Sequence, residues 1–203
     1  MLWLKIATFI VWLYVVYALH RAELFFFKFL VGSVGMFFFL MMFIQPIILH
    51  PLSMAVTAVT GIPGDLFGFY DSYYRHVTLF IPKDTISVSM IIDYECSGIV
   101  EIMAFSSLLW FYPLYNNLEK LVIDTIGIAL IFLVNVLRLF LIAVLIYYYG
   151  NEIFYFAHTL FGRVIFYIFS ITLYFYVFTR PHIIRQKVGV FKYGNIDNIE
   201  PDR

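Results

Sequence analysis

Long apolar runs separated by short polar stretches are the dominant pattern of this chain. A helix needs roughly 20 apolar residues to cross a bilayer, and runs of about that length recur along the sequence. Because lipid offers the backbone no hydrogen-bond partners, each run is predicted to be a membrane helix. The predicted helices lie at about residues 2–19, 25–49, 98–115, 119–149 and 152–179. The expected fold is an all-α polytopic membrane protein with about five to six transmembrane helices.

The stretch between the second and third runs, residues 50–95, has a different pattern. Residues 52–60 are apolar enough to lie in the membrane interface or to re-enter the membrane, and the glycines and proline of 61–65 predict a turn. Two later stretches, 77–81 and 85–94, are rich in β-branched and aromatic residues and predict the two strands of a β-hairpin. Residues 82–84 between them are the predicted short turn. This hairpin would lead the chain directly into the third run.

Composition supports the same fold class. Hydrophobic residues make up 63% of the chain and charged residues only 13%, which is too little polar surface to cover a soluble globule. The formal net charge is zero, so no surface for nucleic acid is predicted. The single cysteine, Cys96, cannot form an intramolecular disulfide, and no spacing of cysteine and histidine indicates a metal site. No metal and no cofactor are therefore predicted.

Basic residues decide the expected orientation. They cluster between the first two runs and after the last one, and the positive-inside rule places both clusters in the cytoplasm. The first cluster is His20, Arg21 and Lys28, and the second is Arg180, Arg185, Lys187 and Lys192. Residues 50–95 are then extracytoplasmic. We expect a protein of the cell membrane with one transmembrane domain, 1–188, and a polar cytoplasmic tail, 189–203. The first run is expected to be a retained span, because no small-residue cleavage site follows it.

Three polar residues are predicted to meet at one depth in the membrane. Cys96 lies at the outer start of the third run. Arg138 lies roughly 27 Å up an outward helix, and His158 roughly 12 Å below the outer start of an inward one, at about 1.5 Å per residue. All three fall in the outer third of the bilayer, although they come from different segments. A thiol, a histidine and an arginine are the components of a cysteine acyl-transfer site.

Each of these residues has a chemical role in the predicted site. The positive end of the helix dipole favours a thiolate at Cys96. His158 can accept the thiol proton and return it to a leaving amine, and Arg138 can stabilise an oxyanion or bind a substrate carboxylate or phosphate. Asn135, three residues before Arg138 on the same helix face, can hold the arginine or share the substrate. Two further charged residues are expected either to pair with each other or to support the site: Glu101 and Arg163.

The motifs around these residues resemble those of the exosortase/archaeosortase family of membrane-embedded transpeptidases. The run Glu-Cys-Ser-Gly-Ile at 95–99, which includes Ser97 and Gly98, is similar to the family's cysteine motif. The run Asn-Val-Leu-Arg at 135–138 is similar to its Asn-x-x-Arg motif, and His158 matches its third catalytic position. Order and spacing agree over about residues 85–165. The length is similar to that of the small, stand-alone members from Gram-positive bacteria.

This resemblance implies a cysteine-dependent transpeptidase or peptidase in contact with membrane lipids. Its substrates would be exported proteins whose C-terminus carries a short motif, an apolar helix and a basic end. Cleavage would pass through a thioester on Cys96. The new C-terminus would then be transferred to an amine acceptor in a lipid or in the cell envelope.

A second interpretation is a non-catalytic membrane subunit of an exopolysaccharide export or assembly system. A free cysteine in a membrane protein is most often a small inert apolar residue, and an arginine near a helix end can snorkel to the surface. Reaction of Cys96 with an alkylating probe added outside whole cells distinguishes the two interpretations. An intramembrane metalloprotease has little support, because no HExxH motif or second histidine lies at helical spacing from His158.

Overall fold

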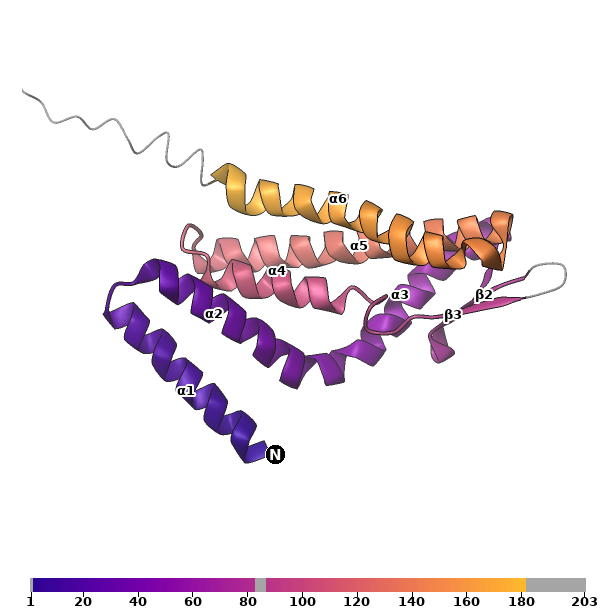
Figure 1. The fold of residues 1–203 in the computed structure, drawn as a ribbon. Helices are drawn as coiled ribbons and strands as arrows, with labels where there is room; N and C mark the ends of the chain where they lie inside the picture. The colour runs from indigo at the N-terminus through magenta and orange to yellow at the C-terminus, as the bar shows by residue number, and fades with distance from the viewer. Residues whose placement is uncertain (1, 83–86, 182–203) are drawn as a thin grey trace, which may run out of the picture.

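The computed structural model describes residues 2–82 and 87–181. Helices make up most of the molecule, and one small sheet lies at one end of the helical bundle (Figure 1). The α-helices are α1 (Leu2–Arg21), α2 (Phe25–Phe39), α3 (Gln45–Phe67), α4 (Ile99–Phe111), α5 (Asn117–Tyr149) and α6 (Gly162–Tyr174). Short π-helical and 3-10 segments lie between or beside them: η1 (Leu40–Ile44), η2 (Tyr74–His76), η3 (Asn151–Ile153), η4 (Phe156–Phe161) and η5 (Phe175–Thr179).

Three of the described helical stretches are long and apolar enough to cross a membrane: Phe25–Phe67, Asn117–Tyr149 and Asn151–Thr179. α4 is apolar but has only 13 residues. At 1.5 Å per residue it extends about 20 Å, less than the roughly 30 Å of the hydrocarbon core. A multi-pass membrane protein is therefore supported. The described helices do not confirm the larger number of spans that the sequence predicts, and the predicted tail at 189–203 lies outside the described residues.

The prediction of a turn at residues 61–65 is wrong. α2, η1 and α3 form one bent helix that continues to Phe67 (Figure 1). The bend coincides with the π-helical η1 and with Pro46 in the first turn of α3. Interruptions of this kind are the usual causes of sharp bends in long helices.

The glycines of α3 serve close packing instead of a turn. A Cβ atom on Gly61 would lie 2.1 Å from the Ser72 hydroxyl oxygen, and one on Gly64 would lie 2.5 Å from the Tyr70 ring. Only glycine lets the chain after α3 fold back this closely. The helix ends at Gly68, whose φ of 69° lies in the left-handed region that glycine adopts without strain.

The predicted hairpin is confirmed and belongs to a three-stranded antiparallel sheet. Its strands are β1 (Asp71–Tyr73), β2 (Thr78–Ile81) and β3 (Val88–Ile91), in the order β1-β2-β3. The sequence analysis missed β1, and the described residues include Pro82 but not the rest of the predicted turn at 82–84. Alternate residues of the sheet, Leu79, Ile81 and Met90, are buried in one core with Leu139 and Ile142 of α5. This core fixes the position of the chain that leaves β3.

α5 is the central element of the bundle, and it packs against α3, α4 and α6. Its N-terminus is closed by a capping box between Asn116 and Glu119. Its buried residues recur at helical spacing: Ile131, Asn135, Arg138, Leu139, Ile142 and Ile146. Asn135 and Arg138 thus lie between the core under the sheet and a second core around Phe105, Leu109 and Phe166.

Candidate active site

A tight turn between β3 and α4 carries the single cysteine. The Asp93 carbonyl accepts hydrogen bonds from the backbone N–H groups of Cys96 (3.2 Å) and Ser97 (2.9 Å). One carboxylate oxygen of Asp93 also accepts from the N–H groups of Glu95 (3.0 Å) and Cys96 (3.3 Å). The turn closes at Gly98, whose φ of 76° suits glycine and whose Cα faces Asn135 closely. Cys96 is thereby held immediately before α4, with only 3% of its surface exposed.

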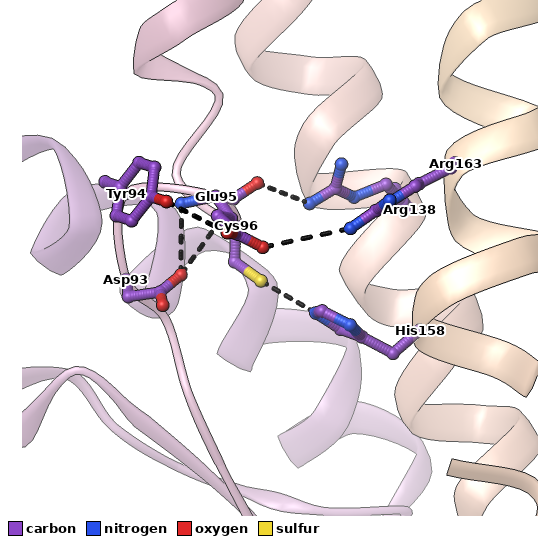
Figure 2. Close-up of polar contacts among 7 residues, drawn as sticks. All are labelled: Asp93, Tyr94, Glu95, Cys96, Arg138, His158 and Arg163. Atoms are coloured by element: carbon purple, nitrogen blue, oxygen red, sulfur yellow. Dashed lines mark hydrogen bonds and ion pairs between the residues drawn. The ribbon is translucent and has the colours of Figure 1, made fainter. Parts of the chain in front are cut away.

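His158 contacts the thiol directly. Figure 2 shows the Cys96 side chain pointing to the imidazole, and the distance between Sγ and Nε2 is 2.9 Å. His158 lies in the π-helical segment η4 (Phe156–Phe161), and its ring stacks parallel to that of Phe154 with centroids 5.8 Å apart. π-Helical turns often occur at functional sites. Stacking and the sulfur contact together fix the orientation of the ring.

Two polar side chains of α5 hold the backbone of the cysteine turn. Asn135 is completely buried, and its side-chain amide donates a hydrogen bond to the Cys96 carbonyl at 2.7 Å. Arg138 is 6% exposed and donates to the Glu95 carbonyl at 3.3 Å (Figure 2). The Arg138 guanidinium also lies over the Phe166 ring, 5.3 Å from its centroid. Within the described part of the chain, Arg138 Nε and Asn135 Oδ1 are buried without hydrogen-bond partners.

Burial controls the protonation of Cys96. It raises the pKa of the thiol to about 11, and the opposing effect of the Arg138 charge is smaller. The carboxylates of Asp93 and Glu95 raise the pKa further. Desolvation thus acts against the thiolate that the helix dipole and the arginine favour at the start of α4. A raised pKa favours the neutral thiol at neutral pH, in hydrogen-bond contact with His158 Nε2.

Of the two alternatives for Glu101 and Arg163, the described part of the chain does not show an ion pair between them. Arg163 instead forms an ion pair with Glu95, with 3.8 Å between Nη2 and Oε2, and both side chains are about half exposed, at 50% and 51%. An exposed pair of this kind stabilises a fold by about 0–1 kcal/mol. The pair lies at a small pocket of about 190 Å³, which Glu101 and Arg138 also line. Glu101 and Arg163 thus line the same pocket.

The structure brings together the residues that the sequence places at one depth. Cys96 and His158 are in contact, and Asn135 and Arg138 bind the backbone beside them. Their catalytic roles stay predictions. Ser97 has a local part: its hydroxyl donates to the Tyr94 carbonyl at 3.2 Å and accepts from the Ile99 N–H at 3.4 Å.

Sequence analysis missed Asp93. An aspartate whose side chain accepts hydrogen bonds from N–H groups two and three residues later forms a recognisable turn motif. The position of Asp93, three residues before Cys96, was the sequence signal that could have predicted this turn.

Comparison with known proteins identifies the family. No curated protein and no solved structure matches this chain. The model of the transmembrane exosortase family matches residues 1–175, which include every element of the site described above. The match covers most of the 203 residues. The chain therefore belongs to the transmembrane exosortase family.

Proposed function

We propose that this protein is a membrane-embedded cysteine transpeptidase that cleaves a C-terminal sorting signal and transfers the new C-terminus to an amine acceptor. The observation that carries the proposal is the 2.9 Å contact between Cys96 Sγ and His158 Nε2. A thiol paired with an oriented imidazole is the arrangement that nucleophilic catalysis by cysteine requires. A buried arginine beside this pair supports the proposal further, because intramembrane charges are costly without a function.

Acylation begins from the neutral thiol. As Sγ attacks the scissile carbonyl carbon, its proton passes to His158 Nε2 and a carbon–sulfur bond forms. The carbonyl oxygen gains negative charge, and in this mechanism the Arg138 guanidinium donates hydrogen bonds to it. When the tetrahedral intermediate collapses, the carbon–nitrogen bond breaks. The imidazolium then returns the proton to the leaving amine, which leaves a thioester on Cys96.

In this mechanism, the turn that carries Cys96 holds the nucleophile in a fixed position. Asp93 and Asn135 hold the backbone on either side of the thiol, through the N–H and the carbonyl of Cys96. A nucleophile on a fixed backbone loses little entropy on reaching the reactive geometry.

The substrates we propose are exported proteins with a C-terminal apolar helix and a basic end, because such a helix would reach this site within the membrane.

The test uses an exported protein encoded beside this one whose C-terminus has that pattern. Processing is measured in membranes that contain equal amounts of enzyme. We expect Cys96→Ala and Cys96→Ser to abolish processing, because serine is a far weaker nucleophile without a dedicated base. Glu152→Gln, an exposed charge change in η3, is the matched control and should process normally.

Two results would contradict the proposal. Cys96→Ser retaining more than about a tenth of the activity would limit the contribution of the thiol to about 1.4 kcal/mol of barrier. Normal function of the host envelope with Cys96→Ala would favour the non-catalytic membrane subunit instead.

A further inference from the structure

The small pocket beside the cysteine turn contains four charged side chains, and only two of them are paired. Glu95 and Arg163 form the exposed ion pair. The remaining charges are Glu101 of α4 and Arg138 of α5, which line the same pocket of about 190 Å³. Among the described residues, Glu101 forms no hydrogen bond or ion pair. The pocket thus presents one unpaired carboxylate and one guanidinium with a free N–H.

The location of Glu101 makes this carboxylate unusual. It lies partly buried in the first turn of α4, five residues after Cys96. It lines a pocket together with Arg163, Phe166 and Tyr167 of α6, which places it on the side of α4 that faces α6. An ionisable residue in an otherwise apolar helix of a membrane protein is costly to bury and is a functional candidate. The helix N-terminus offsets part of this cost, but it provides no counter-ion.

Arg138 gives independent evidence for a ligand in this pocket. Its side chain is 6% exposed, and its Nε–H is buried without a hydrogen-bond partner in the described part of the chain. A buried donor of this kind costs about 1–3 kcal/mol unless a ligand satisfies it. Arg138 also lines the pocket, so a ligand bound there lies beside this side chain.

We propose that Glu101 binds the ammonium group of the acceptor amine and accepts a proton from it, so that the thioester on Cys96 is resolved by aminolysis. This inference rests on the proposed function. The charges that develop during aminolysis of a thioester are a negative oxygen and a positive nitrogen on the same carbon. Arg138 can stabilise the negative oxygen, whereas Glu101 binds the ammonium before the attack and then takes one of its protons, which leaves the neutral amine that attacks.

The protons and bonds balance in this step. The bound ammonium gives one proton to the Glu101 carboxylate and becomes a free amine. Its nitrogen attacks the thioester carbon, a carbon–nitrogen bond forms and the carbon–sulfur bond breaks. The second proton passes through His158 to the departing Cys96 sulfur, which restores the neutral thiol. The products are an amide and a protonated Glu101 that returns its proton to solvent.

The experiment uses the single cysteine of the chain as a specific acylation site. The full-length enzyme in detergent is acetylated with p-nitrophenyl acetate, and excess reagent is removed. The acetyl-enzyme is then offered ethanolamine in water, and the ratio of N-acetylethanolamine to acetate is measured. We expect Glu101→Gln to lower this ratio at least tenfold, whereas Glu152→Gln keeps the wild-type ratio.

Hydroxylamine provides the internal control for folding. It is uncharged at neutral pH and needs no counter-ion, so its transfer should differ less than threefold between wild type and Glu101→Gln. Glu101→Asp, which retains a carboxylate, should recover part of the ethanolamine transfer.

The outcomes separate the two proposals. An unchanged ethanolamine ratio in Glu101→Gln, or an equal loss with hydroxylamine, would overturn the role of Glu101 and leave the cysteine mechanism intact. No acetyl thioester on wild-type Cys96, or equal acetylation of Cys96→Ala, would overturn the proposed nucleophile and this inference with it.

Discussion

At the scale of single residues, the site depends on a competition between burial and charge at Cys96. Burial raises the pKa of the thiol to about 11, although Arg138 opposes the shift. The sequence places the cysteine at a helix start, where a thiolate is expected, and burial of the side chain acts against that expectation. In the proposed mechanism, a neutral thiol needs His158 as its base.

A pH profile of alkylation tests this competition. Iodoacetamide reacts with the thiolate, so the rate for native Cys96 should keep rising up to about pH 11, whereas in the denatured chain it should level off near the ordinary pKa of 9.0. The folded state holds the proton more tightly. This contribution to stability is complete below pH 9.0 and is lost as the pH rises to about 11. A native profile that levels off below pH 8 would show a preformed thiolate.

Arg138 provides a second prediction at this scale. Arg138→Lys should lower processing nearly as much as Arg138→Ala, by at least about tenfold or 1.4 kcal/mol. Lysine keeps the charge but loses the planar fork that binds the Glu95 carbonyl and stacks on Phe166. Equal amounts of folded protein in the membrane are the control. Full activity with lysine would reassign Arg138 to a role that needs only charge.

At the scale of elements, α4 and α5 are joined by a polar contact inside the membrane bundle. Asp124 of α5 is 9% exposed and accepts hydrogen bonds from the Ser106 hydroxyl (2.7 Å) and the Trp110 indole (3.0 Å) of α4. One turn away, Gly127 lets α5 approach closely, because a Cβ there would lie 2.2 Å from the Phe105 ring. The hydrogen bonds of Asp124 and the close approach at Gly127 together fix the position of α4, the helix that follows the cysteine turn.

Asp124→Ala should therefore destabilise the protein by about 1–3 kcal/mol, because it leaves the Ser106 and Trp110 donors without their acceptor. Thermal unfolding in detergent measures the loss. Thr125→Ala is the matched control, since Thr125 is exposed and its hydroxyl bonds only within its own helix, to the Leu121 carbonyl. Equal unfolding temperatures for the two variants would show that the contact does not support the bundle.

At the scale of the whole molecule, periodicity and composition predict the class of the fold but not its packing. The long apolar runs predict membrane helices, and the hairpin follows from its β-branched residues. The continuous α3 could not be predicted, because proline and glycine favour a turn locally. Only the close approach of Ser72 and Tyr70 shows that Gly61 and Gly64 serve packing. The convergence of Cys96, Arg138 and His158 followed from helix length and direction alone.

The orientation of the molecule in the membrane is the last prediction, because the outer-face site depends on it. Ile91 in β3 is 68% exposed and Leu118 at the opposite end of α5 is 79% exposed. In a Cys96→Ala background, Ile91→Cys should react with an impermeant maleimide added to whole cells, because the positive-inside rule places the sheet outside. Leu118→Cys should react only after the cells are opened. The reverse pattern would place the sheet and the cysteine turn at the cytoplasmic face, where a site for exported substrates could not work.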